Sequence, residues 1–338
     1  MPTPNQESKL DLTALMENAG AKDGILDFPS FIRFALYEPE RGYYSKQRKR
    51  VGRQSQTDFY TAQSLGPVFG KLVVQSCATL LGKSNLSEYV FVEIGAEPEE
   101  SLLEGTIHSF SASSTIRLGD KIQIPEKSVV FANEWLDSQP FRRFRFDKDK
   151  GWIERGLKLG KDSQLKEVDL PETGIPLPQC LQESDSQSCH NYILDLPVGA
   201  NQALEELCNQ PWSGLFLTFD YGLSLRQFIE ERPKGIARAY HRHKLTDKLT
   251  ANVGEQDLTC HVCWDMLSEI LEKSGFENLF LERQESFFLK HANSVVEQIV
   301  KAKPGTFDAD RQTLLELLHP GNMGSKFQAF GGVRNQST

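Results

Sequence analysis

The stretch "VFVEIGAEPEESLLEG", Val90 to Gly105, decides the fold. Its apolar residues lead into Glu93 and then into Gly95 at a turn, which is how a strand of a nucleotide-binding sheet ends. Such a turn normally continues with further glycines, because the backbone must come close to the ligand there. This chain continues instead with "AEPEE" (96–100). The stretch therefore predicts the first strand of a parallel sheet, with an unusual turn behind it.

Apolar strands alternate with helices through most of the chain. The segments "YVFVEIG" (89–95) and "GLFLTFDYG" (214–222) are nearly continuous apolar runs, typical of strands buried on both faces of a sheet. Helical apolar spacing marks residues 68–81 and 264–276, and the second of these ends at a glycine. This order predicts an α/β fold in which helices flank a mostly parallel sheet.

Two further segments interrupt the alternation. Residues 141–160 alternate like a pair of antiparallel strands, with turn residues at 149–151. Residues 161–190 are polar and carry three prolines, so we expect little regular structure there. We predict four parts in one α/β fold with an added lid or subdomain: an N-terminal helical segment and lid (1–88), the first half of the core (89–140), inserted strands and a polar loop (141–190), and the second half of the core (191–338).

The bulk composition restricts the possible functions. The 338 residues are 39% hydrophobic and 25% charged, as in ordinary soluble globular proteins. The net charge of −8 argues against nucleic-acid binding, which needs a basic field. The basic run "KQRKRVGRQ" (46–54) is open to two interpretations, a solvated loop or a phosphate or partner site. No apolar run approaches the roughly 20 residues of a membrane span, and the N-terminus has no apolar signal core, so we expect a cytoplasmic protein.

The cysteines do not indicate a disulfide framework or a metal centre. Six cysteines are scattered over the chain, and such scatter is unlike the spacing of a stapled secreted domain. The segment "CHVC" (260–263) has the spacing of a ligand pair. A structural zinc site needs a second pair, which is not evident, so the sequence predicts no metal.

Six motifs occur in order between residues 35 and 330. They are "ALYEPERGYYS", "DFYTAQSLGPVFGKL", "FANEWLDSQPFRRF", "FDYG", "GEQDLTCHV" and "HPGNMGSKFQAF". Together they resemble the MidA-like family of class I S-adenosylmethionine-dependent methyltransferases, relatives of the mitochondrial complex I assembly protein arginine methyltransferase. The resemblance implies a Rossmann-like fold, S-adenosylmethionine as cofactor and an arginine of a partner protein as methyl acceptor. It leaves the oligomeric state open.

The resemblance also implies a set of cofactor-binding residues. The family's turn after the first strand reads Glu-Leu-Gly-x-Gly-x-Gly. Glu93 and Gly95 match its start, whereas Glu97 and Glu99 stand where the later glycines belong. A glutamate there has a steric cost and adds negative charge beside a ligand that bears a carboxylate.

Three further residues complete the implied cofactor set. Asp58 and Thr61, in "TDFYT", stand beside the cofactor in the family. No residue clearly matches the acid that ends the second strand and holds the ribose hydroxyls. Asp120, in "RLGD", is a candidate for such a contact, and the alternative is a loop aspartate that stabilises its own turn.

The first half of the core is short. Residues 96–128, between Gly95 and Val129, number only 33, and each βαβ unit takes roughly 30 residues or more. Two full units do not fit into this length. We therefore expect at least one helix to be missing or reduced to a loop.

Acidic residues at strand ends are the candidates for catalysis. Carboxylates match the donor fork of a guanidinium, and ligands of open α/β sheets sit at the carboxyl ends of the strands. The motif "FANEWLD" supplies Asn133 and Glu134, and "GEQD" supplies Glu255 and Asp257. The resemblance favours a catalytic role for these four residues. The alternative is that the polar residues of both motifs cap the helices that follow them.

Three more residues are predicted to contact the substrate. Asp137 follows "FANE", Asp220 ends the central strand in "FDYG", and His261 follows "GEQD". For His261 a hydrogen-bonded core histidine is the competing interpretation.

Two functions follow from these residues. The first is an S-adenosylmethionine-dependent protein methyltransferase, which the retained acids favour. The second is an inactive relative, a pseudoenzyme that uses the same cleft to bind a partner protein in assembly or regulation. The acidic turn and the shortened first half favour this alternative, because both elements contact the cofactor in the family.

Overall fold

The computed structural model describes residues 12–46, 66–82, 85–98, 100–171, 190–242, 244–302 and 308–335. The chain divides into two compact units. Unit 1 contains residues 1–48, 139–199 and 226–260, and unit 2 contains residues 49–138, 200–225 and 261–338. Each unit is therefore built from three separate stretches of chain.

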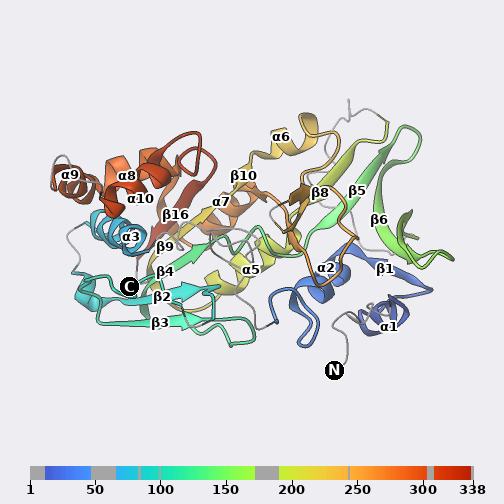
Figure 1. Ribbon diagram of the computed structural model, residues 1–338, viewed down its shortest axis with the longest axis horizontal. Coiled ribbons are helices and arrows are strands. Elements are labelled where there is room, and N and C mark those ends of the chain that lie inside the picture. The colour runs from blue at the N-terminus through green and yellow to red at the C-terminus, as the bar shows by residue number, and fades with distance from the viewer. Residues whose placement is uncertain are drawn as a thin grey trace, which may run out of the picture. The chain divides into compact units, whose positions relative to one another are not determined.

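Unit 2 is built on a six-stranded sheet in the order β15-β16-β9-β4-β2-β3 (Figure 1). Its strands are β2 (Val90–Ile94), β3 (Ala112–Ile116), β4 (Lys127–Asn133), β9 (Ser213–Asp220), β15 (Phe276–Arg283) and β16 (Gln328–Arg334). Strands β3, β2, β4 and β9 are parallel, and β16 runs antiparallel between β9 and β15. The predicted mostly parallel α/β sheet is confirmed, with Val90–Ile94 as its first strand.

Helices cover both faces of this sheet. They are α3 (Pro67–Leu80), α5 (Val198–Cys208), α7 (Trp264–Lys273), α8 (Gln284–His291), α9 (Asn293–Lys301) and α10 (Ala309–Leu318). Phe91, Phe131 and Phe219 point to the face that packs on α3, α8, α9 and α10. Val92 and Val130, one position along, pack on α5 and α7. Successive side chains of a strand point to opposite faces, so strands covered on both sides are apolar throughout.

The segment between β2 and β4 contains a strand but no helix in its described residues, 95–98 and 100–126. Leu102, Leu103 and Phe110 from this segment are buried in the core beside α3. Gly70 of α3 permits this close approach, because a Cβ there would lie 2.5 Å from Thr106 Oγ1. The predicted loss of a helix is confirmed, and a loop of apolar side chains covers the sheet in its place.

Unit 1 contains a smaller antiparallel sheet in the order β1-β6-β5-β8, with β7 paired to the other edge of β6. Its strands are β1 (Ile25–Asp27), β5 (Arg142–Asp147), β6 (Gly151–Leu159), β7 (Leu165–Asp169) and β8 (Ile193–Leu196). The antiparallel pair predicted for 141–160 is confirmed. The expectation of little regular structure over 161–190 is wrong at β7, because the long strand β6 pairs with β7 as well as with β1 and β5. Residues 172–189 lie outside the described part.

Shorter elements complete both units. Unit 1 also contains α1 (Leu12–Asn18), α2 (Phe28–Tyr37), α6 (Leu225–Glu230, which begins at the unit boundary), β11 (Arg238–His241), β12 (Lys244–Thr246) and β13 (Asp257–Thr259). Unit 2 contains the short parallel pair β10 (Gly222–Leu223) and β14 (Val262–Cys263), and the 3₁₀ helix η2 (Leu86–Glu88). Among the described residues, no helix has the length and apolar character needed to cross a membrane.

Candidate functional site

The turn that follows β2 is anchored by the last strand residues themselves. Glu93 is buried, and its Oε2 accepts a hydrogen bond of 2.8 Å from the backbone N–H of Leu102. Gly95 has a φ of +76°, a left-handed conformation that glycine adopts without a Cβ penalty. A Cβ at Gly95 would lie 3.1 Å from Cδ1 of Trp135. Glu93 thus fixes the position of Leu102. Position 95 favours glycine because its φ is positive and because a Cβ there would crowd the Trp135 ring.

Arg117, the first residue beyond β3, holds the same turn from the side. Its Nε donates to the carbonyl of Glu97 at 3.2 Å, and its Nη2 donates to the carbonyl of Glu100 at 3.0 Å. Asp120 is exposed, and its Oδ2 accepts a hydrogen bond of 2.8 Å from the backbone N–H of Arg117. An arginine therefore stands at the strand end where an acid was expected, and Asp120 makes the contact of a turn-stabilising residue.

Asn133 and Glu134 lie at the carboxyl end of β4. The Glu134 N–H donates to the Phe219 carbonyl at 2.9 Å, and Asn133 Nδ2 donates to Glu134 Oε1 at 3.1 Å. Oδ1 of Asn133 is buried and accepts no hydrogen bond from any described residue. Glu134 has a φ of +51°, which costs roughly 1–2 kcal/mol for a residue with a Cβ. Strained backbone and unpaired buried polar atoms concentrate at functional sites.

Tyr221 and His261 complete a polar and aromatic cluster with Glu134. The Tyr221 hydroxyl donates to Glu134 Oε2 at 3.2 Å. The Tyr221 ring lies nearly parallel to His261, with centroids 6.1 Å apart, and it packs on Phe327 at 4.3 Å. A carboxylate beside aromatic rings at the carboxyl ends of β4 and β9 suits a cationic or planar ligand group.

Asp220, at the end of β9, is fully buried below this cluster. Its Oδ2 accepts hydrogen bonds from the backbone amides of Leu136 at 3.0 Å and Asp137 at 3.3 Å, and its Oδ1 accepts one from Tyr221 at 2.9 Å. Burial raises the pKa of Asp220 to about 7, against the lowering effect of these amides. Asp220 therefore ties the turn after β4 to the end of β9.

The predicted site residues do not all lie in one unit. Glu93, Gly95, Asp120, Asn133, Glu134, Asp137, Asp220 and His261 belong to unit 2, whereas Glu255 and Asp257 belong to unit 1. In unit 1, Asp257 is buried and its Oδ1 accepts a hydrogen bond of 2.9 Å from the Tyr44 hydroxyl. Glu255 is exposed and pairs with Lys46. Asp58 and Thr61 lie outside the described residues, as do Glu99 and most of the basic run 46–54.

The helix-cap alternative for these acids is wrong. No helix begins after β4 within residues 134–141, where the chain turns and enters β5. Glu255 lies in a turn, and Asp257 is the first residue of β13 rather than the cap of a helix. The polar residues at these strand ends therefore serve contacts other than helix capping.

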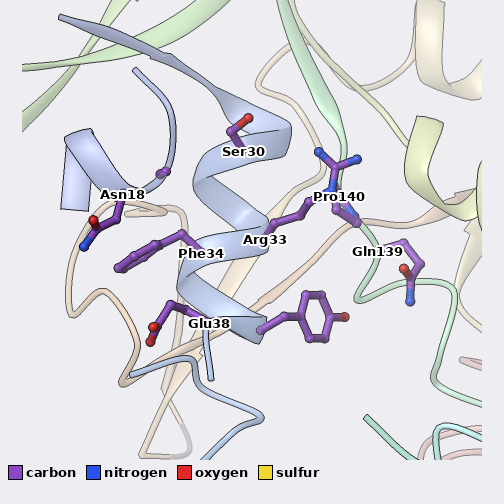
Figure 2. Close-up of a pocket in the computed structure, with 9 residues that line it drawn as sticks. Asn18, Ser30, Arg33, Phe34, Glu38, Gln139 and Pro140 are labelled. Atoms are coloured by element: carbon purple, nitrogen blue, oxygen red, sulfur yellow. The ribbon is translucent and has the colours of Figure 1, made fainter. Parts of the chain in front are cut away.

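A separate pocket of about 500 Å³ lies in unit 1 along one side of α2 (Figure 2). Its lining is Asn18, Ala19, Ser30, Arg33, Phe34, Tyr37, Glu38, Gln139 and Pro140. Glu38 Oε2 accepts a hydrogen bond of 2.6 Å from the backbone N–H of Arg41, so this acid stabilises the turn that follows α2. None of the predicted site residues lines this pocket.

Sequence reasoning missed two residues of the unit 2 site. Arg117 was not singled out, although its place one residue beyond an expected strand is a signal that was available. Tyr221 was not predicted as a site residue, and nothing in "FDYG" alone indicates that its hydroxyl reaches Glu134, which is 87 residues away in the chain.

The strand order of unit 2, with one antiparallel strand inserted beside the parallel set, defines a class I methyltransferase-like fold. A family model described as "Putative S-adenosyl-L-methionine-dependent methyltransferase" matches residues 65–280. The chain belongs to this family.

Solved structures agree on the fold. The chain superposes on a Burkholderia thailandensis protein, crystallised bound to S-adenosylhomocysteine, with a TM-score of 0.83 at 21% identity over 100% of this chain and 96% of that chain. A native crystal structure of an uncharacterized protein from the same organism gives a TM-score of 0.80 at 20% identity, with the same coverage. No curated protein matches the sequence significantly.

Proposed function

We propose that this protein transfers a methyl group from S-adenosylmethionine to a nitrogen of a partner protein, with arginine as the acceptor. The observation that carries the proposal is the Asn133, Glu134 and Tyr221 arrangement at the carboxyl ends of β4 and β9. Ligands of open α/β sheets bind at this edge. Membership in a family of S-adenosylmethionine-dependent methyltransferases supports the same reaction class.

The chemistry of this edge fits the cofactor. S-adenosylmethionine supplies an electrophilic methyl group on a positively charged sulfur, and Glu134 places negative charge at this edge. Gly95 gives the β2 turn its positive φ, and the space that a Cβ would take there is bordered by Trp135. We assign the cofactor to this turn together with Asp58, Thr61 and Asp120. Glu93 contributes indirectly, because its carboxylate holds the amide of Leu102.

The acceptor side follows from charge and hydrogen-bond geometry. During transfer the acceptor nitrogen bonds to the methyl carbon as the carbon–sulfur bond breaks, and the nitrogen then releases one proton. Glu134 can accept hydrogen bonds from a guanidinium and orient it. The buried Oδ1 of Asn133 offers a further acceptor. Asp137, Asp220 and His261, which all belong to unit 2, surround this position in the proposal. The catalytic role that the resemblance implies for Glu255 and Asp257 stays a prediction for unit 1 alone.

A second function is favoured by the turn after β2. Arg117 takes the place of the acid expected at the end of β3, and acidic residues take the place of the glycines. A protein with this turn could bind a partner without methyl transfer. Calorimetric titration with S-adenosylmethionine and S-adenosylhomocysteine separates the two functions.

We expect binding with a Kd of roughly micromolar strength, abolished in Gly95→Val and retained in the matched variant Gly119→Val. Gly119 also has a positive φ, of +88°, but no atom lies within 4 Å of its Cβ position. Absence of heat at millimolar ligand would contradict the methyltransferase proposal and favour the partner-binding function. Mass spectrometry of arginine-containing partner peptides, with Glu134→Gln as the comparison, then tests the acceptor.

A further inference from the structure

The turn after β2 is gripped by side chains from two neighbouring strands. Arg117 contacts the carbonyls of Glu97 and Glu100 through Nε and Nη2, and its Nη1 also contacts Thr115 Oγ1. The described residues of this turn are 95–98 and Glu100. Arg117 thus contacts the backbone of Glu97 and of Glu100, in the acidic stretch that stands where the family's turn has glycines.

The opposite side of the turn is held by β2. The Glu93 carboxylate accepts the Leu102 N–H at 2.8 Å, and the Gly95 N–H donates to the Ile116 carbonyl at 2.9 Å. Strands β2 and β3 are themselves paired in parallel up to Ile94 and Ile116. The Glu93 carboxylate and the Ile116 carbonyl therefore both belong to the paired strands β2 and β3, directly before the turn.

Each nitrogen of the Arg117 guanidinium makes a hydrogen bond within the protein. A guanidinium has five N–H donors on three nitrogens and no acceptor. All three nitrogens of Arg117 already contact protein oxygens, two of them backbone carbonyls. Three of its five N–H donors are used in this way, two of them on the turn, so the contacts that the structure shows for Arg117 indicate a role in holding the turn.

We propose that Arg117 is a positioning residue for cofactor binding, which holds the carbonyls of Glu97 and Glu100 in the arrangement that leaves the ligand edge of β2 accessible. This inference rests on the proposed function. Glycines allow a turn to approach a ligand because they lack side chains. Here the turn carries bulky residues, and the pull of Arg117 on the carbonyls of Glu97 and Glu100 fixes where those residues lie. The hydrogen bonds of Arg117 thereby fix the backbone of a turn that glycines shape in the family.

The test compares Arg117→Gln and Arg117→Lys with wild type in two measurements. The first is amide hydrogen exchange over residues 95–106 without ligand, and the second is the calorimetric Kd for S-adenosylhomocysteine. We expect exchange at Gly95 and Leu102 to accelerate about tenfold or more in Arg117→Gln, with a matching loss of affinity of about tenfold or more. Arg117→Lys should be intermediate, since a single ammonium does not reproduce the fork. Arg226→Gln, which removes an exposed i,i+4 pair with Glu230, is the control and should change neither quantity.

Each outcome decides the inference. Unchanged affinity in Arg117→Gln would overturn it even if exchange accelerates, because the clamp would then be purely structural. If wild type itself gives no heat with S-adenosylhomocysteine, the proposed function fails first, and the positioning role fails with it. If circular dichroism shows that Arg117→Gln is unfolded, Thr115→Val removes one contact of the same guanidinium. That variant must then show weaker binding for the inference to stand.

Discussion

The hydroxyl of Tyr221 donates a hydrogen bond to Oε2 of Glu134 at 3.2 Å, which joins the ends of the neighbouring parallel strands β9 and β4. Both side chains are half-buried, and the Tyr221 ring packs on the rings of His261 and Phe327. The bond orients a carboxylate at the edge of the sheet where ligands of this fold class bind.

Tyr221→Phe removes this hydrogen bond while the aromatic packing stays. A single hydrogen bond contributes about 1 kcal/mol, so we expect the free energy of unfolding to fall by no more than this amount. The activation free energy of methyl transfer should rise by more than this amount, because the Glu134 carboxylate loses the hydrogen bond that orients it. Urea denaturation and mass-spectrometric methylation assays measure the two quantities. A variant with full activity would show that the hydroxyl is only structural.

Glu134→Gly and Glu134→Ala separate backbone strain from side-chain chemistry. Both variants lose the carboxylate, but only glycine relieves the φ of +51°. We expect Glu134→Gly to be more stable than Glu134→Ala by about 1 kcal/mol, and both to lack activity. Equal unfolding free energies would contradict the strain, and an active variant of either kind would contradict the role of the carboxylate.

Asp220 should make stability depend on pH. Burial raises the pKa of Asp220 in the folded state to about 7, above the ordinary aspartate value of about 3.9, so the folded state binds more protons than the unfolded state between these values. The resulting contribution to stability is fully present below about pH 4 and is lost as the pH rises through 7. Asp220→Asn has no such titration. Its unfolding free energy relative to wild type should therefore rise by about 2–3 kcal/mol from pH 5 to pH 8.

Urea denaturation at the two pH values measures this difference. Asp120→Asn is the control, because it makes the same substitution at an exposed position. A constant difference for Asp220→Asn would show that its carboxyl group titrates normally.

Gly95→Ala should be more destabilising than Gly119→Ala. Both glycines have a positive φ, so both substitutions strain the backbone by roughly 1 kcal/mol. Only the Cβ at position 95 also meets Trp135, at 3.1 Å. We expect an additional loss of about 1 kcal/mol and a shift of tryptophan fluorescence in Gly95→Ala alone. Equal thermal stabilities would mean that the Trp135 ring moves aside freely.

Asp195→Ala should strongly destabilise unit 1. Asp195 is fully buried, its Oδ1 accepts from Arg143 at 2.7 Å, and its Oδ2 accepts from the amides of Ile236 and Ala237 at 2.8 and 2.9 Å. Removing Asp195 leaves the largely buried Arg143 with Glu167 as its remaining carboxylate, 3.3 Å from Nε, and leaves two buried amides without their acceptor. Breaking such a buried pair costs about 3 kcal/mol or more. Asp162→Ala, which breaks an exposed pair with Lys166, should have little effect on stability. A loss below about 1 kcal/mol for Asp195→Ala would contradict the buried pair.

The secondary-structure pattern could be predicted well because it is local. Continuous apolar runs predicted β2 and β9, and helical spacing predicted α3 and α7. The count of residues between Gly95 and Val129 predicted the missing helix. The short strand β7 was not predicted, because its sequence is polar and its pairing with β6 is a contact that the local sequence does not reveal.

The candidate site was predicted only in part. The side chains at the ends of β2, β4 and β9 could be anticipated, because parallel strands end at the same edge of a sheet. Their partners could not: Glu93 holds an amide nine residues away, and Tyr221 reaches Glu134 across 87 residues. Glu255 and Asp257, the acids of the "GEQD" motif, were predicted to act with Asn133 and Glu134, but they belong to unit 1, whereas Asn133 and Glu134 belong to unit 2.

The sequence by itself determined the class of fold, the order of its elements and the shortened first half, since hydrophobic periodicity and segment length are properties of neighbouring residues. Only the tertiary structure decided which side chains hold the acidic turn. Arg117 meets the carbonyls of Glu97 and Glu100 because β3 pairs beside β2, and pairing between strands brings together residues that the chain itself keeps 17 and 20 positions apart.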